Sequence, residues 1–260
     1  METDALLDLL KDVAARVITP RFRALAHGEV TEKRPGDLVT IADHEAEQMI
    51  TEALRETDPD ALVVGEEAAS VDATLLERLP GSEHAFTVDP VDGTKNFVNG
   101  SANHAVMVAE LRGGTVTRSW IWQPEHQTSF VSERGHGVLR NGARLPALHP
   151  PAGLEDLRVL TSRPGWEGPL GRLTLTPSAW CCGVDYPWVA EGRVDGTLYS
   201  RSLPWDHAPG SLLVEEMGGI LRHTDGSAYR PCQVGSRPLL AAANEEVWKA
   251  VAGQLRRLVY

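Results

Sequence analysis

Residues 87–97, Thr-Val-Asp-Pro-Val-Asp-Gly-Thr-Lys-Asn-Phe, constrain the fold more than any other segment. The apolar run that leads into them predicts a buried strand ending at Asp89. Pro90 should turn the chain, because proline cannot continue a central strand. Asp92 is followed by glycine, which is typical of a turn, and a helix can begin at Thr94. The segment therefore predicts a strand, a tight turn and a helix start, with two carboxylates close together.

This turn combines groups that favour a metal-bound phosphate. Asp89 and Asp92 can converge on one point, and the backbone N–H groups of Gly93 and Thr94 would be unpaired at a helix start, where they attract anions. Hard carboxylate oxygens beside an anion-binding turn suggest a divalent cation that holds a phosphate. For this segment taken alone, the alternative is an ordinary turn in which the aspartates are only turn formers.

Two further acidic segments strengthen the first interpretation. Glu66 follows a short apolar strand at residues 61–64, and Asp206 stands at the start of a predicted helix. The motifs Gly-Glu-Glu at 65–67, Asp-Pro-Val-Asp-Gly-Thr-Lys-Asn-Phe at 89–97 and Trp-Asp-His-Ala-Pro-Gly at 205–210 resemble, in order and spacing, those of the inositol monophosphatase family of metal-dependent phosphatases. The likeness runs over nearly the whole chain.

The resemblance implies an α+β fold, a layered α-β-α-β-α sandwich of the inositol monophosphatase and fructose-1,6-bisphosphatase type, and a homodimer. We expect an N-terminal α+β subdomain at residues 1–148 with most metal ligands. A C-terminal α/β subdomain at 149–260 would carry Asp206 and the substrate contacts, and the proline-containing stretch 146–153 is the candidate linker. Periodicity itself predicts a first helix at residues 5–17, a hairpin or turn at 28–37 and a helix after Thr40.

The same resemblance implies the metal ligands. A first ion would bind Glu66, Asp89 and the carbonyl of Val91, a second would bind Asp89, Asp92 and Asp206, and a weaker third would involve Glu66. Four carboxylates and a phosphate cannot converge without cations, because their mutual repulsion would be strongly unfavourable. Two or three Mg²⁺ ions balance these charges, and oxygen-only ligands suit Mg²⁺ or Mn²⁺ rather than zinc.

Glu66, Thr94 and Asp43 are the catalytic residues that the resemblance implies. Asp43 would position Thr94, and Thr94 would orient a metal-activated water for in-line attack on a phosphate held by Gly93 and Thr94. Simpler roles remain open at this point: Thr94 and Asp206 as helix N-caps, and Asp43 as the partner of Thr40 in a capping box. Lys33 lies near a lysine of the family's mobile active-site loop, or is a surface lysine.

The substrate contacts are less well defined, and the candidates are Asp185, Tyr199, Arg201 and His207. Tyr199 stands seven residues before Asp206, where inositol-type members have a glutamate that binds ring hydroxyls. Arg201 would bind a second anionic group or lie in solvent, and His207 would contact substrate or be a satisfied histidine near the surface. We expect a Mg²⁺-dependent phosphomonoesterase that acts on a small phosphorylated polyol or sugar.

Inositol 1-phosphate ranks first among the substrates. The alternatives within the superfamily are histidinol phosphate, sugar bisphosphates and 3′-phosphoadenosine 5′-phosphate. An alternative of another class is an inactive relative that binds a phosphorylated ligand or a protein partner.

Composition excludes several other partners. The formal net charge of −11 argues against duplex DNA or anionic lipid. The longest apolar runs fall short of a membrane span, and the first residues do not have the pattern of a signal peptide. Three cysteines are too few for a disulfide framework and fit a reducing compartment. The sequence therefore predicts a cytoplasmic enzyme whose partner is a small phosphorylated metabolite.

Overall fold

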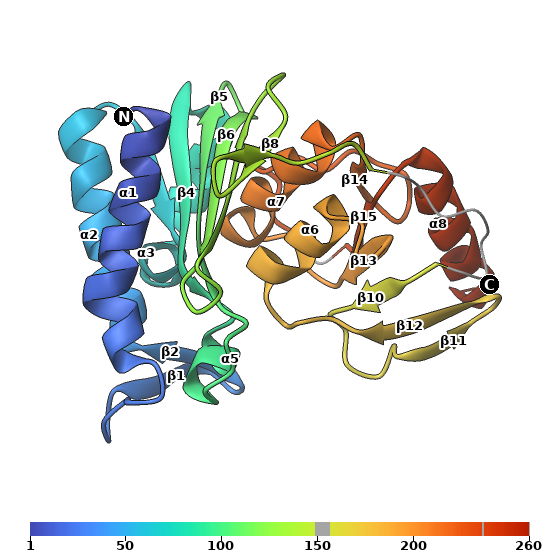
Figure 1. Cartoon of the computed structure of the whole chain (residues 1–260), viewed down its shortest axis with the longest axis horizontal. Helices are drawn as coiled ribbons and strands as arrows, with labels where there is room; N and C mark the ends of the chain where they lie inside the picture. Colours follow the sequence, from blue (N-terminus) through green and yellow to red (C-terminus); the bar gives the residue numbers. More distant parts are fainter. Residues whose placement is uncertain (149–156, 236, 260) are drawn as a thin grey trace.

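Alternating layers of helices and sheets make up the computed structural model, which describes residues 1–148, 157–235 and 237–259. Helices α1 (Thr3–Val13) and α2 (Ile41–Thr57) cover the outer face of a seven-stranded sheet, and α6 (Cys182–Ala190) and α7 (Pro204–Glu216) lie between it and a six-stranded sheet (Figure 1). Helix α8 (Glu245–Val259) covers the far face of the second sheet (Figure 1). The predicted α-β-α-β-α order is confirmed.

The first sheet is mostly an antiparallel meander with one parallel pair at its edge. Its strand order is β3-β4-β5-β6-β7-β8-β9. The bounds are β3 Leu62–Gly65, β4 His84–Asp92, β5 Ala105–Arg112, β6 Thr115–Gln123, β7 Thr128–Glu133, β8 Val138–Arg140 and β9 Ala143–Arg144. Only β3 and β4 run parallel, and Gly65 pairs with Val88. This register places the next residues of the two strands, Glu66 and Asp89, side by side.

The expected end of the strand at Asp89 is wrong. Strand β4 continues through Pro90 to Asp92, and its pairing with β5 shifts register between Asp89 and Asp92. The regular pairing with β5 is interrupted at this point, so the missing N–H of Pro90 costs no regular hydrogen bond between the two strands. Proline is therefore tolerated here. The turn comes at Gly93, whose φ of 83° lies in the left-handed region. The short helix α5 (Thr94–Val98) then begins as predicted.

The second sheet has the order β11-β12-β10-β13-β15-β14. Its bounds are β10 Val159–Thr161, β11 Gly168–Leu170, β12 Leu173–Pro177, β13 Gly196–Tyr199, β14 Ile220–His223 and β15 Leu239–Ala242. The apolar stretches at 157–161, 194–200 and 239–243 predict strands, and they form β10, β13 and β15. The sequence pattern does not indicate β11, β12 or β14. The subdomain boundary at 148/149 adjoins residues 149–156, which lie outside the described residues, so it stays a prediction.

Short elements complete the chain around the first sheet. The hairpin expected at residues 28–37 is β1 (Val30–Arg34) and β2 (Asp37–Thr40). Helix α3 (Glu66–Val71) follows β3 directly, and α4 (Thr74–Arg78) comes before β4. A π-helical turn, Ala14–Ile18, and a 3-10 turn, Thr19–Arg21, extend α1. Within the described residues, no helix is long and apolar enough to cross a membrane.

The two central helices approach closely because of a glycine. A Cβ built on Gly210 of α7 would lie 2.0 Å from the ring of Tyr186 on α6, and that ring is fully buried. The contact needs a glycine since a rigid aromatic ring cannot move aside cheaply. It also sets the position of α7, and therefore of Asp206 in its first turn.

We predict that Gly210→Ala lowers the free energy of unfolding by about 1–3 kcal/mol, the usual cost of overpacking. Urea denaturation measures this change. Gly253→Ala is the matched control, because Gly253 lies on α8 with open space around its Cβ position. The control should gain roughly 0.5–1 kcal/mol from its higher helix propensity. Equal effects of the two substitutions would contradict the packing argument.

Candidate metal centre

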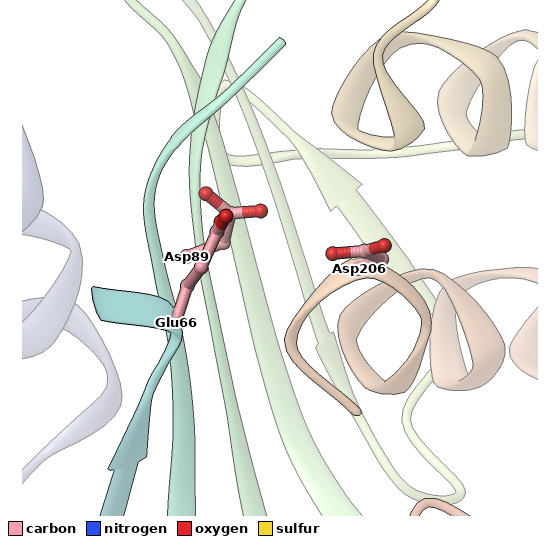
Figure 2. Close-up of side chains that lie close together, drawn as sticks. All are labelled: Glu66, Asp89 and Asp206. Atoms are coloured by element: carbon pink, nitrogen blue, oxygen red, sulfur yellow. The ribbon is translucent and has the colours of Figure 1, made fainter. Parts of the chain in front are cut away.

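Three carboxylates from different elements converge at the edge of the first sheet. Glu66 is the first residue of α3, Asp89 lies near the end of β4, and Asp206 lies in the first turn of α7. Each offers an oxygen, and these atoms all lie within 4.8 Å of one another. Figure 2 shows Glu66 and Asp89 together, with Asp206 facing them from α7. Two layers of the fold must therefore dock before this cluster exists.

The cluster suits a hard divalent cation. One oxygen of Asp89, Oδ1, is buried without a hydrogen-bond partner. Desolvation, followed by the charges of the neighbouring carboxylates, raises the pKa of Asp89 and of Asp206 well above the ordinary value. A bound cation removes this strain because it favours the ionised carboxylates. Oxygen ligands of this kind match Mg²⁺ and Mn²⁺, so the residues fit the metal that the sequence predicts.

Asp92 lies outside the three-residue group and is held by α6. Its Oδ2 accepts hydrogen bonds from the Cys181 thiol at 2.9 Å and from the N–H of Gly183 at 2.5 Å. Burial raises its pKa to about 6, although these two donors oppose the shift. The start of α6 thus fixes the orientation of Asp92 beside the cluster. Its role as a ligand of a second ion stays a prediction.

Thr94 and Asp43 are brought together as the sequence predicts. The Thr94 hydroxyl lies 3.1 Å from Asp43 Oδ1 and 3.0 Å from the Val91 carbonyl. Asp43 Oδ2 accepts from the N–H and hydroxyl of Thr40, at 2.9 and 2.6 Å, in a capping box. The Asp43 carboxylate therefore accepts hydrogen bonds from both Thr40 and Thr94. Thr94 is not the N-cap of α5, because Gly93 occupies that position.

Asp206 is likewise not a helix cap. The N-cap of α7 is Leu203, and Asp206 lies three residues further on with its carboxylate in the acidic cluster. Trp205 beside it is buried in a hydrophobic cluster, so it is a packing residue.

Glu47 is a buried acid that the sequence analysis missed. It lies on α2, one turn after Asp43, and its carboxylate accepts from the N–H groups of Glu67 and Ala68 at 2.7 and 2.8 Å. It therefore caps α3 from a neighbouring helix and fixes the start of the helix that carries Glu66. A Cβ on Gly65 would lie 2.2 Å from the Glu47 carboxyl carbon, so a larger residue there would displace the carboxylate that caps α3. The sequence signal that could have identified Glu47 is its position four residues after Asp43, which places both acids on one face of α2.

Lys33 of the β1–β2 hairpin reaches the same acids, so its alternative as a surface lysine is wrong. Its Nζ lies 2.7 Å from Glu66 Oε1 and 2.9 Å from Glu67 Oε1. Burial lowers the pKa of the ammonium, but the two glutamates outweigh burial and raise the pKa above its ordinary value. Lys33 thus supplies a fixed positive charge at Glu66.

The four predicted substrate contacts line one cavity of about 670 Å³, together with Asp92 and Asp206. Asp185 is buried on α6 and accepts from the Ala179 N–H at 2.8 Å. Tyr199 ends β13, and the side chain of Arg201 is exposed. His207 bonds through its two ring nitrogens to the Tyr186 hydroxyl and the Arg201 carbonyl, at 2.8 and 2.9 Å. It is a satisfied histidine, but a buried one rather than one near the surface.

We predict that the metal-free protein loses stability as pH rises from about 4 to 7. The carboxyls of Asp43 and Asp92 have a folded-state pKa of about 6, above the unfolded value, and those of Asp89 and Asp206 are raised further. The folded state therefore binds more protons in this window. Mg²⁺ at about 100 times its dissociation constant should restore about 2.7 kcal/mol at neutral pH.

Thermal unfolding across this pH range, measured once with EDTA and once with Mg²⁺, gives both the pH dependence and the stabilisation by the metal. Asp89→Asn should be more stable than the wild type without metal at neutral pH, and it should not respond to Mg²⁺. Asp225→Asn is the control, since Asp225 lies in an exposed turn distant from the cluster in sequence. A wild-type protein with the same unfolding temperature in EDTA and in Mg²⁺ would contradict a metal centre here.

Comparison with known proteins agrees with this geometry. The model of the inositol monophosphatase family matches residues 2–260. The inositol-1-monophosphatase of Rhizobium meliloti is 29% identical over 272 residues, covering 99% of this chain and 98% of the relative. The Nus factor SuhB of Pseudomonas aeruginosa is 31% identical over 76% of each chain.

Solved structures show the same fold. The Thermotoga maritima IMPase superposes with a TM-score of 0.78 at 26% identity, covering 98% of both chains. The extragenic suppressor protein SuhB of Bartonella henselae gives a TM-score of 0.79 at 26% identity, covering 97% of this chain and 99% of that one. The chain belongs to the inositol monophosphatase family.

Proposed function

We propose that this family member is a Mg²⁺-dependent phosphomonoesterase that hydrolyses a small phosphorylated polyol or sugar with a metal-activated water. The observation that carries the proposal is the convergence of Glu66, Asp89 and Asp206 within 4.8 Å. Beside this cluster, the Thr94 hydroxyl at the start of α5 donates a hydrogen bond to the Asp43 carboxylate on α2. A carboxylate cluster beside a positioned hydroxyl suits phosphoryl transfer to water.

Two or three Mg²⁺ ions, with Mn²⁺ as a possible substitute, fit the available ligands. One ion would be held by Glu66, Asp89 and the Val91 carbonyl. A second ion would be held by Asp89, Asp92 and Asp206. A weaker third ion would involve Glu66. When bound, the metal lowers the pKa of a water ligand and stabilises charge on the phosphoryl oxygens.

The chain's own groups would orient the water and the phosphate. Asp43 Oδ1 accepts from the Thr94 hydroxyl, which leaves a Thr94 lone pair to accept a hydrogen bond from the attacking water. Burial raises the pKa of Asp43 to about 6, so this carboxylate can take up a proton through Thr94 near neutral pH. The N–H groups of Gly93 and Thr94 would contact the phosphoryl oxygens. No covalent phosphoenzyme is needed.

The substrate with the best support from the relatives is inositol 1-phosphate. The Rhizobium meliloti relative carries the name inositol-1-monophosphatase. An inactive, ligand-binding relative is less well supported, because all four metal-site acids and Thr94 are present. We further propose a homodimer that acts in the cytoplasm.

Thr94→Val should lower kcat by about 10²–10⁴-fold, the usual contribution of a positioned proton-transfer group. Valine keeps the shape of threonine but removes the hydroxyl that orients the water, so the KM should change little. The measurement is Mg²⁺-dependent phosphate release from inositol 1-phosphate.

Asp92→Asn is the second variant, and it should lose at least about 100-fold in kcat/KM. Thr74→Val is the matched control for threonine, since Thr74 lies on α4, where its hydroxyl bonds to Asp72. Full activity of the Thr94 variant would remove Thr94 from the mechanism. The absence of phosphate release by the wild type from a broad panel of monoesters would contradict the proposed function.

A further inference from the structure

A second pocket, with a volume of about 600 Å³, lies at the end of α7 that is distant from the acidic cluster. None of the metal, catalytic or substrate residues predicted from the sequence lines it. Glu215, which does line it, follows Asp206 on α7 at a distance of about 14 Å along the helix axis. This pocket is therefore separate from the cavity beside the acidic cluster.

Three layers of the fold meet around this space, which we call the layer-junction pocket. The first sheet contributes the β5–β6 turn at 113–116, and α7 contributes Ser211 and Glu215. The second sheet contributes residues 220–222 of β14 and the loop at 228–232. Figure 1 shows α7 between the first sheet and β14. A ligand in the layer-junction pocket would therefore contact both sheets and the helix between them.

Arginine dominates the charge of the layer-junction pocket. Arg134, Arg222 and Arg230 line it, and Glu215 is the one acid among the described residues that do so. The whole chain has the opposite balance, with 36 acidic residues and 25 lysines and arginines. Guanidinium groups bind phosphate and carboxylate through paired N–H donors. The pocket therefore favours an anion with several oxygen atoms.

Arg134 is held in position but is only partly neutralised. Its Nε donates to the Val116 carbonyl at 2.8 Å, and its Nη2 lies 3.1 Å from Glu215 Oε2. The side chains of this ion pair are 39% and 55% exposed, so water competes with the pairing and the pair is weak. An anion in the pocket can therefore take over part of the guanidinium.

The other two arginines come from the second sheet and the loop that follows β14. Arg222 pairs with Glu245 at 3.0 Å, and Glu245 lies outside the pocket lining. Arg230 is exposed and forms no ion pair with another described residue. Of the three cations, Arg230 is thus the most available to a ligand.

The layer-junction pocket shares an apolar cluster with the metal centre. Val116 lines the pocket and packs in the hydrophobic cluster that also contains Val64 of β3 and Trp205 of α7. Val64 lies two residues before Glu66, and Trp205 directly precedes Asp206. The packing of this cluster therefore sets the separation between carboxylates from two layers.

Tyr229 makes a second connection between the two places. It lines the layer-junction pocket, and its ring centroid lies 6.3 Å from that of His207, the residue after Asp206. A ligand that fixes the loop at 228–232 would thereby also restrict the first turn of α7.

We propose that the layer-junction pocket binds a phosphate group, either as free phosphate or as part of a small metabolite, and that the bound anion holds the layers together. Arg134 would contact the anion from the first sheet, and Arg222 and Arg230 from the side of the second. The volume lies within the usual range for small-molecule sites, about 300–1,000 Å³, so an organic group has room beside the phosphate.

The bound anion should raise the affinity of the acidic cluster for Mg²⁺, because it favours the docked arrangement of the layers that brings the carboxylates together. This coupling rests on the proposed metal centre, whereas binding of the anion does not.

Isothermal titration calorimetry of the full chain in EDTA tests the anion site. Without metal the acidic cluster repels phosphate, so saturable binding reports the pocket. The probes are inorganic phosphate and phosphonoacetate, whose carbon–phosphorus bond a phosphomonoesterase does not hydrolyse, at constant ionic strength. We expect one site per chain. Tighter binding of inorganic phosphate would assign free phosphate as the ligand, and tighter binding of phosphonoacetate would assign an organic one. The absence of saturable binding for both probes would overturn the proposal.

Two variants should change the affinity for the anion in opposite directions. Arg230→Ala should weaken binding about tenfold, since it removes a charged hydrogen-bond donor. Glu215→Gln should strengthen binding about threefold, because it removes the carboxylate and releases Arg134. Arg172→Ala is the matched control, since Arg172 is an exposed arginine between β11 and β12 that does not line the pocket. Unchanged binding in Arg230→Ala, or weaker binding in Glu215→Gln, would contradict the assignment to this pocket.

Titration of Mg²⁺ with and without saturating anion, also by calorimetry, measures the coupling. The wild type should bind Mg²⁺ about fivefold more tightly with the anion present. Arg230→Ala should lose this gain, whereas a gain caused by anion bound directly at the metal centre would survive the substitution. Equal Mg²⁺ affinities of the wild type in the two titrations would overturn the coupling. If Mg²⁺ does not bind at all, the proposed metal centre is wrong, and the anion site is judged by the titration in EDTA.

Discussion

The convergence of carboxylates from two layers of the fold is the constraint on which the rest of the structure depends. Glu66 and Asp89 reach the cluster from adjacent parallel strands, and Asp206 reaches it from the central helix layer (Figure 2). Burying like charges so close together is unfavourable without cations. The structure compensates at fixed points: Lys33 neutralises part of the charge at Glu66, and the start of α6 holds Asp92. The negative charge that these contacts leave uncompensated in the carboxylate cluster is suited to binding metal ions.

Neighbouring side chains fix the geometry of this centre. Glu47 caps α3 and thereby sets the position of Glu66, and Asp43 joins the start of α2 to Thr94. On the other side of the cavity, His207 links Tyr186 to the backbone of Arg201. Each of these residues is buried, so its orientation is set by packing as well as by hydrogen bonds. A site assembled from separate layers depends on such supports, because small shifts of either layer would separate the ligands.

Local patterns made most of the first half of the fold predictable. The Gly113–Gly114 pair between two apolar runs predicts a hairpin, and Thr40 with Asp43 predicts a capping box. Each signal lies within a few residues, and the structure has both the β5–β6 hairpin and the capping box. Strands β11 and β12 were missed, since Pro169, Pro177 and the nearby glycines argue against strands. They exist because they pair with each other and with β10 at one edge of the sheet, a contact that no local pattern encodes. The roles of Glu47 and Lys33 depend on tertiary contacts in the same way. The α-β-α-β-α order of the layers was predicted from the resemblance to the family and not from the periodicity of apolar residues.

The most direct test of the account is a crystal structure of the protein soaked in Mn²⁺, with data collected for anomalous scattering. Mn²⁺ replaces Mg²⁺ at sites built from oxygen ligands, and its anomalous signal identifies it without reference to chemical assumptions. The account predicts at least one strong peak among Glu66, Asp89 and Asp206, and the loss of that peak in Asp89→Asn. A fully ordered site without a peak, with the three carboxylates still in place, would contradict the claim that this cluster is a metal centre.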